Sequence, residues 1–202
     1  MENKRLFTIG YIEHDNNVHS QFLGKSIDAL IGEFNVISKS DKKCPAENYN
    51  EMLDECKTPY LILTHQDISF SSNLLERIEK TIEIVPNFGA LGIVGADYNG
   101  NIRWSDINNI YELDTLDSCF IVIKVENAPK FDSVNFNEYH LYVEDYCGNL
   151  SRNLNKKIYT IAMDRKSFEH HSATLRVRGG AWGNYMLYRK KLNDKWYGIR
   201  TT

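Results

Sequence analysis

The sequence predicts an α/β fold, in which a mostly parallel sheet is flanked by helices and continues into a smaller mixed or antiparallel part. In the first half of the chain, short apolar runs alternate with segments whose apolar residues recur at helical spacing. The second half is more mixed, with strongly β-prone runs at residues 119–123 and 158–163. The 202 residues fit one domain that is large enough to bury a single core.

Strands and helices alternate through the first ninety or so residues. Predicted strands lie at residues 6–12, 34–38 and 60–64, and predicted helices at residues 18–34, 49–56 and 74–85. The run at 60–64 is continuously apolar, as expected of a central parallel strand covered on both faces. Asn73 and Glu76 indicate an N-terminal cap for the third helix, and Pro86 follows its end.

The later elements are less regular. A small-residue strand is expected at 90–96, and Asn99-Gly100 is a favourable hairpin turn. A helix is predicted from about Glu144 to Asn155. The end of the chain is basic and aromatic, and residues 173–183 with their two adjacent glycines are predicted to form a mobile loop.

Charge and composition narrow the functional classes. The formal net charge is −3, which disfavours a general nucleic-acid binder. The four cysteines form no CxxC pair and are expected to be reduced thiols. No secretory cleavage site follows the first apolar run, and no run approaches the roughly 20 residues of a membrane span. We therefore expect a soluble, cytoplasmic protein.

The polar triplet His65-Gln66-Asp67 follows the predicted central strand. Ligands of open α/β sheets bind outside the carboxyl ends of the parallel strands, where this triplet would lie. A carboxylate and an imidazole there could hold Mg²⁺ or Mn²⁺ together with substrate phosphates. The alternative is that Asp67 caps a turn and His65 is structural.

Three further groups could carry chemistry. Glu144-Asp145 at a helix start could supply a general base, although the helix dipole alone would explain two acids there. Of His170 and His171, at most one could join a metal site, because adjacent side chains point in different directions. Arginines in the tail could clamp a diphosphate or simply be solvated.

Taken together, these segments resemble bacterial glycosyltransferase-like proteins related to glycosyltransferase family 2. The resemblance covers nearly the whole chain and rests on the order of the motifs. They are Asn48-Tyr49-Asn50, Thr58 to Ile68 with the "HQD" triplet, Leu116-Asp117-Ser118-Cys119, Phe131-Asp132, Tyr139 to Cys147, His170-His171-Ser172 and Lys195-Trp196.

The resemblance implies a single GT-A domain over residues 1–202. About residues 1–100 would form the half that binds the nucleotide-sugar. About residues 101–202 would form the acceptor-side half together with the C-terminal loop and tail. The triplet takes the place of the family's DXD motif, with His65 where the first Asp usually stands. Asp67 and His65 would then hold Mn²⁺ or Mg²⁺, completed by His171 or, alternatively, His170.

Roles for the other residues follow from the same resemblance. Asp145 would be the catalytic base of an inverting transfer, with Glu144, Tyr142 and Trp182 on the acceptor side. The donor, a nucleoside-diphosphate sugar, would be bound by the remaining residues in addition to the triplet. These are Ser38, Asp41, Asp117, Arg176 and Arg178.

The resemblance also implies partners and a setting. The acceptor would be a saccharide or a lipid-linked saccharide, used in the assembly of a surface polysaccharide or glycan. Peripheral association with the inner face of the membrane and formation of a homodimer both stay open.

Two other functions remain open. One is a non-catalytic GT-A-like binding or assembly module. The other is a nucleotidyltransferase, although residues 12–17 lack the Gly-rich basic loop of that class.

Overall fold

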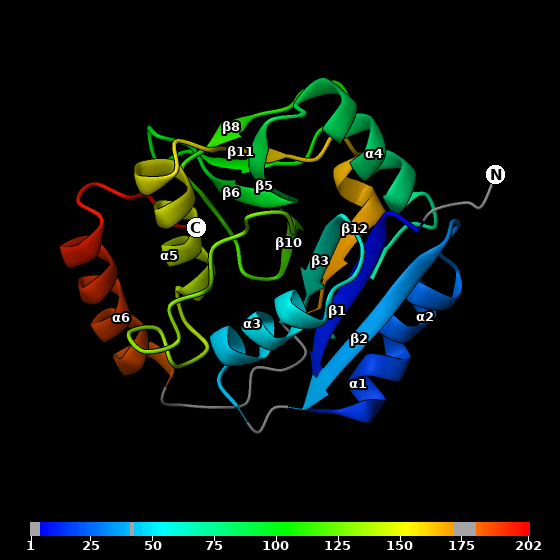
Figure 1. The fold of residues 1–202 in the computed structure, drawn as a ribbon, viewed down its shortest axis with the longest axis horizontal. Coiled ribbons are helices and arrows are strands. Elements are labelled where there is room, and N and C mark those ends of the chain that lie inside the picture. Colours follow the sequence, from blue (N-terminus) through cyan, green and yellow to red (C-terminus); the bar gives the residue numbers. More distant parts are fainter. Residues whose placement is uncertain (1–4, 41–42, 172–180) are drawn as a thin grey trace.

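A seven-stranded sheet forms the centre of the protein (Figure 1). The computed structural model describes residues 5–40, 43–171 and 181–202, and the side chains of residues 181–184 lie outside this description. The strand order is β2-β1-β3-β10-β5-β11-β8. Its strands are β1 (Phe7–Glu13), β2 (Phe34–Ser40), β3 (Tyr60–Thr64), β5 (Phe88–Gly92), β8 (Glu112–Leu113), β10 (Phe120–Lys124) and β11 (Lys157–Thr160).

The sheet is mostly parallel, as predicted. Strands β1, β2, β3, β5 and β11 run in one direction, whereas β10 and β8 run against them. Strand β10 lies between β3 and β5, so its amino end meets the carboxyl end of β3. The main sheet draws strands from both sides of residue 100, and the predicted division into two halves at that point stays a prediction.

Helices cover both faces of the sheet. They are α1 (Asn16–Gln21), α2 (Leu23–Asp28), α3 (Pro45–Glu55), α4 (Leu74–Ile84), α5 (Tyr142–Gly148) and α6 (Ala181–Lys195), with a π-helical turn at Asn149–Asn153 and a 3₁₀ turn at Arg165–Ser167. Because side chains alternate along a strand, Leu61 and Leu63 of β3 pack with α3 and α5, and Ile62 packs on the opposite face with α2 and α4. The α/β class predicted from the apolar runs is confirmed.

Helix α3 approaches β1 closely at Gly10. A Cβ atom at this position would lie 2.7 Å from the sulfur of Met52 and 3.0 Å from a methyl carbon of Leu63. A side chain here would displace the ends of the Met52 and Leu63 side chains, so glycine allows them to pack closely on β1.

Two small antiparallel sheets complete the fold. One contains β7 (Ile102–Trp104), β6 (Val94–Ala96) and β9 (Thr115–Leu116) in that order. The predicted turn at Asn99-Gly100 joins β6 to β7, and Gly100 has a φ of 83° that glycine adopts without strain. The other pairs β4 (Ile68–Phe70) with β12 (Phe168–His170). These sheets form the predicted smaller antiparallel part.

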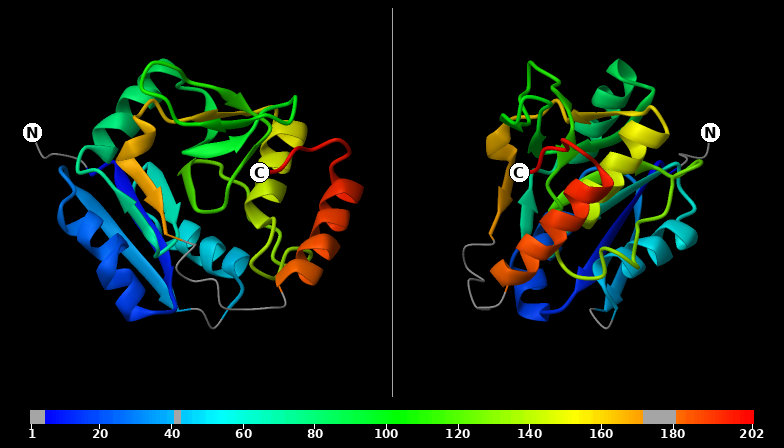
Figure 2. Two further views of the ribbon diagram at one scale, coloured as in Figure 1. Left: turned by 180° about the vertical axis from the view of Figure 1, so that it is seen from behind. Right: turned by 90° about the vertical axis from the view of Figure 1, so that its left-hand side faces the viewer.

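Two predicted helices need correction, and a third helix was not predicted. The helix predicted over 18–34 is broken at Phe22, which leaves the helical region at φ −119° and ψ −82° and stacks its ring on His171 with centroids 3.9 Å apart. The helix predicted from Glu144 begins earlier, at Tyr142, and continues into the π-helical turn. The tail is a helix, α6, whose buried Tyr188 and Leu192 pack on the core beside α5 (Figures 1 and 2).

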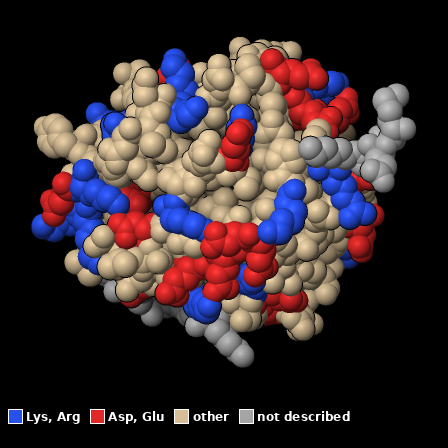
Figure 3. Space-filling view, in the orientation of Figure 1, with Lys and Arg blue, Asp and Glu red and all other residues tan. Residues whose placement is uncertain are grey.

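Charge on the molecular surface is mixed. Figure 3 shows acidic side chains gathered over α3 with basic side chains around them. Several are ion-paired, among them Glu55 with Lys39 and Asp54 with Lys130. Within the described residues, no helix combines the length and the apolar character needed to cross a membrane. The four cysteines are all free thiols, as expected.

Candidate functional site

The carboxyl end of β3 carries the candidate site. Strand β3 is buried between two helical layers, and His65 is the first residue beyond it. The backbone N–H of His65 donates to the carbonyl of Cys119 at 3.0 Å, which fixes the end of β3 against the start of β10. The chain then turns into β4, and Asp67 immediately precedes that strand.

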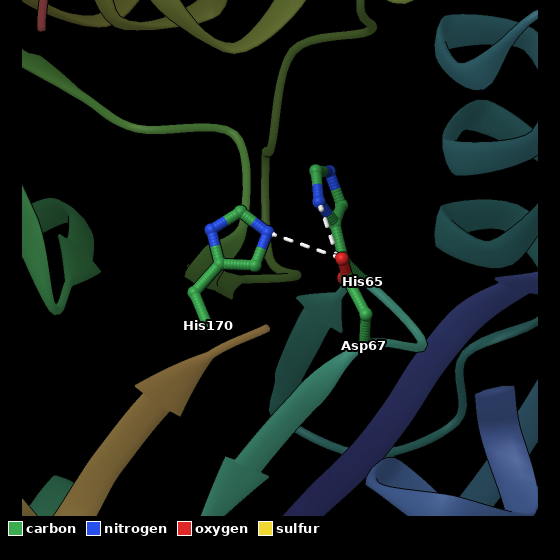
Figure 4. Close-up of side chains that lie close together, drawn as sticks. All are labelled: His65, Asp67 and His170. Carbon is green, nitrogen blue, oxygen red and sulfur yellow. Dashed lines mark ion pairs between the residues drawn. The ribbon is translucent and has the colours of Figure 1, made fainter. Parts of the chain in front are cut away.

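Strand β12 brings a histidine to Asp67 from far along the sequence. In the β4–β12 pair, His170 lies opposite Ile68. Its Nε2 lies 3.5 Å from Oδ2 of Asp67, and Nδ1 of His65 lies 4.0 Å from Oδ1 of the same carboxylate. Figure 4 shows both imidazoles beside the Asp67 carboxylate, each joined to it by a dashed line. We call His65, Asp67 and His170 the HDH group.

His171, the metal ligand predicted from the sequence, is directed elsewhere. Its Nε2 lies 3.0 Å from the Ser69 hydroxyl, and its ring stacks on Phe22. Neighbouring residues of a strand point to opposite sides, so only one of the two histidines can face Asp67. His170, the predicted alternative, is the histidine that faces Asp67. The backbone N–H of His171 donates to the carbonyl of Asp67 at 2.9 Å.

The HDH group is an electrostatically coupled unit. Burial disfavours the charged form of each member, yet the His170 hydrogen bond and charge lower the pKa of Asp67 below its usual value. The same contact raises the pKa of His170 despite burial. Burial and the nearby His170 lower the pKa of His65. An ionised Asp67 and a neutral His65 are the forms that bind a metal ion, whereas His170, with its raised pKa, would have to lose its proton when an ion binds.

Gln66 connects the site to the end of β1. Its side chain is fully buried, and its Oε1 accepts hydrogen bonds from the backbone N–H groups of His14 and Asp15 at 3.1 and 3.2 Å. Asp15 in turn caps α1 through Oδ1. Gln66 therefore ties the end of β1 to the end of β3. Its predicted part in donor binding stays a prediction.

Asp117 and Cys119 enter the site from the start of β10. Asp117 Oδ1 accepts the backbone N–H of Cys119 at 2.9 Å. Both residues, together with His170, line a cavity of about 170 Å³ next to the HDH group. The rest of its lining is largely apolar, from Val94, Ile102, Trp104, Phe168 and Thr202. Asp117, a predicted donor contact, is thus close to the metal-ligand candidates.

Helix α5 carries two predicted residues, of which Tyr142 contacts the HDH group. The Tyr142 hydroxyl lies 3.4 Å from Nε2 of His65, and its ring is packed edge-on against Tyr49. Glu144 is buried, and its Oε2 has no hydrogen-bond partner among the described residues. Burial and the neighbouring Asp117 carboxylate raise the pKa of Glu144 to about 8. A buried carboxyl oxygen without a hydrogen-bond partner is costly, and a carboxyl group with a pKa perturbed in this way is characteristic of functional sites.

Asp145, the predicted catalytic base, is engaged by the C-terminal segment of the chain. Its Oδ1 accepts the indole N–H of Trp196 at 2.6 Å and lies 2.9 Å from Nζ of Lys195. Burial raises the pKa of Asp145, although Lys195 and Trp196 oppose the shift. Gly148 makes room for this arrangement, because a Cβ atom there would lie 2.8 Å from the Trp196 ring. Asp145 therefore anchors the C-terminal segment to α5.

The other predicted residues lie apart from the group or outside the description. Ser38 is exposed on β2, which is an edge strand, and lies opposite Tyr11 of β1. Asp41, Arg176 and Arg178 lie outside the described residues, and so does the side chain of Trp182. Sequence reasoning did not single out Cys119 or Trp104 as site residues; a β-prone run and a lone aromatic carry no local signal for a site.

The donor atoms of the HDH group fit a divalent metal ion. One atom from each of the three residues can be chosen so that all lie within 4.8 Å of one another. Two imidazole nitrogens and one carboxylate oxygen suit ions such as Mn²⁺ or Zn²⁺, with open positions left for water and phosphate oxygens. The group could therefore hold such an ion at the carboxyl edge of the sheet.

Several solved structures have a fold similar to that of this chain. S. aureus TarS 1–349 in complex with UDP-GlcNAc matches with a TM-score of 0.62 and 11% identity, over 94% of this chain and 66% of that chain. GalNAc-T7 with UDP, GalNAc and Mn²⁺ matches with a TM-score of 0.59 and 8% identity, over 80% of this chain and 43% of that chain. A second crystal structure of S. aureus TarS 1–349 matches with a TM-score of 0.58 and 11% identity, over 79% of this chain and 58% of that chain.

The chain spans less than two thirds of each of these structures. No family model matches the sequence, and no curated protein matches it either. At identities of 8–11%, the similarity establishes the fold. The chain therefore has the GT-A fold that these glycosyltransferases share.

Proposed function

We propose that this protein transfers a sugar from a nucleoside-diphosphate sugar to an acceptor hydroxyl, with a divalent ion bound at the HDH group. The observation that carries the proposal is the Asp67–His170 pair beside His65 at the carboxyl end of β3. In an open α/β sheet this edge is where nucleotides bind. Solved structures with the same fold contain UDP-GlcNAc, or UDP with Mn²⁺.

Asp67 and the two imidazoles would hold the ion, which supplies charge neutralisation for the leaving nucleoside diphosphate. Gln66 has a supporting part, because it fixes the backbone on which Asp67 is carried. Tyr142 keeps His65 in place through its hydroxyl. A donor held at these residues would be fixed in place for attack by the acceptor hydroxyl.

The Glu144-Asp145 pair would supply the base, and the hydrogen bonding favours Glu144. Asp145 is already bound to Lys195 and Trp196, whereas one oxygen of Glu144 has no hydrogen-bond partner among the described residues. In its ionised form, Glu144 would take the proton of the acceptor hydroxyl as that oxygen bonds to the anomeric carbon. The bond from the anomeric carbon to the diphosphate oxygen breaks in the same step, which inverts the configuration.

The acceptor is proposed to be a saccharide or a lipid-linked saccharide. The cavity beside the HDH group supports a sugar-sized acceptor portion, because it combines an apolar lining that includes Trp104 with the polar Asp117. Arg165 lies over the Trp104 ring, 4.1 Å from its centroid, and so fixes the ring as one wall of the cavity.

A panel of nucleotide-sugars tests the proposed reaction. The protein is incubated with each donor, Mn²⁺ and a set of short saccharides, and the release of nucleoside diphosphate is measured. We expect turnover with at least one donor, and loss of that turnover in Asp67→Asn. Conversion of the donor to a nucleoside triphosphate and a sugar 1-phosphate when pyrophosphate is added would instead indicate a nucleotidyltransferase. Metal-dependent binding without any turnover would indicate a non-catalytic module.

A further inference from the structure

A second group of ligand-type side chains shares His170 with the HDH group. Asp117, Cys119 and His170 each offer one ligand atom, and these atoms lie within 4.8 Å of one another. The two groups together bring two imidazoles, two carboxylates and one thiol to the end of β3. The motif His65-Gln66-Asp67 contains no sulfur atom. Cys119 would therefore add a sulfur ligand to the nitrogen and oxygen ligands of the site.

Cys119 is held rigidly at this place. Its backbone N–H donates to Oδ1 of Asp117 at 2.9 Å, and its carbonyl accepts from the backbone N–H of His65 at 3.0 Å and from the Thr64 hydroxyl at 3.2 Å. The thiol is buried, and it lines the same cavity as Asp117 and His170. Its neighbours thus fix it relative to both histidines.

The position is not shared by the other cysteines. Cys56 is buried at the C-terminal end of α3, where its thiol contacts Thr58. Cys147 is buried in α5, and Cys44 precedes α3. Among the described residues, Cys119 is the cysteine that belongs to a group with metal-ligand geometry. Cys147 is therefore a matched control, because it is equally buried.

We propose that Cys119 is a sulfur ligand of the ion at this site, and that the site consequently prefers Zn²⁺ or Co²⁺ to Mg²⁺. This inference rests on the proposed function for the presence of an ion at the HDH group. A thiolate and imidazoles are ligands that suit Zn²⁺ and Co²⁺, whereas Mg²⁺ requires oxygen ligands in a near-octahedral arrangement. The thiol gives its proton to solvent when the sulfur binds the ion.

Cobalt absorption spectroscopy on the full chain tests the assignment. Co²⁺ bound to a thiolate gives a near-ultraviolet sulfur-to-metal charge-transfer band, and Co²⁺ in a histidine site also gives visible ligand-field bands. We expect both sets in the wild type and in Cys147→Ser. In Cys119→Ser, we expect the charge-transfer band to vanish while the visible bands remain, with Co²⁺ and Zn²⁺ affinity lowered roughly 10–100-fold or more. Cys119→Ala serves the same purpose if the serine variant does not fold.

The outcomes separate this inference from the proposed function. Visible bands without a charge-transfer band in the wild type, or a charge-transfer band that persists in Cys119→Ser, would overturn sulfur ligation and leave the HDH metal site standing. A wild type that binds Mg²⁺ more tightly than Zn²⁺ would overturn the preference. If no Co²⁺ binds at all, the metal site of the proposed function fails as well.

Discussion

Replacement of Glu144 by glutamine is expected to lower kcat for sugar transfer by about 10²–10⁴-fold, the usual contribution of a general base. Glutamine keeps the shape of the side chain but cannot take the acceptor proton. Metal and donor binding should persist, because Glu144 is not in the HDH group. In the wild type, activity should rise with pH toward about 8, since the ionised carboxylate is the active form.

The same substitution is expected to stabilise the fold at neutral pH. Burial raises the pKa of Glu144 from an ordinary 4.5 to about 8, so the folded state retains a proton that the unfolded state has already released. The resulting loss in the free energy of unfolding is absent below pH 4.5, grows from pH 4.5 to 8 and is complete above pH 8. Glu144→Gln should therefore gain about 1–3 kcal/mol at pH 7 and almost nothing at pH 4. Thermal denaturation at both pH values measures the difference.

Asp145→Asn is the matched comparison for Glu144. Its amide oxygen can still accept the indole N–H of Trp196, so the C-terminal segment should stay attached. We expect this variant to keep a larger share of the transfer activity than Glu144→Gln. The opposite result, with loss of transfer in Asp145→Asn and activity in Glu144→Gln, would return the role of base to Asp145.

Replacement of His170 by alanine is expected to weaken metal binding by more than the roughly 10–100-fold typical of losing an outer-shell partner. His170 offers a nitrogen in the HDH group, 3.5 Å from Asp67. Alanine at His171 is the control, because its imidazole contacts Ser69 and Phe22 instead. Titration calorimetry with Mn²⁺ should show near-normal affinity for that variant. Equal losses in the two variants, or a greater loss in His171→Ala, would place the ligand at His171.

The sequence predicted the fold class because its strongest local signals coincide with the tertiary structure. The run at residues 60–64 is buried by helices on both faces, and the Asn99-Gly100 turn joins two paired strands. Helix α6 was not predicted, because its buried Tyr188 and Leu192 are surrounded by Arg189, Lys190 and Lys191, which are typical of a solvated tail.

The composition of the site was predictable only in part. Asp67 follows a strand that local pattern identifies, so its place at the sheet edge could be foreseen. The choice between His170 and His171 depends on how β12 pairs with β4, and a shift of one residue would exchange the two side chains. In the same way, Lys195 and Trp196 engage Asp145 only because α6 packs beside α5.

Binding of a nucleoside diphosphate with and without a divalent ion tests the central claim most directly. Thermal stability of the full chain is measured with UDP and with GDP, each alone and together with Mn²⁺ or Co²⁺. At a ligand concentration about 100 times Kd, we predict a stabilisation of about 2.7 kcal/mol for one nucleotide, only when the ion is present and not in Asp67→Asn. The absence of a shift with either nucleotide under all ion conditions, or an equal shift in Asp67→Asn, would contradict the account.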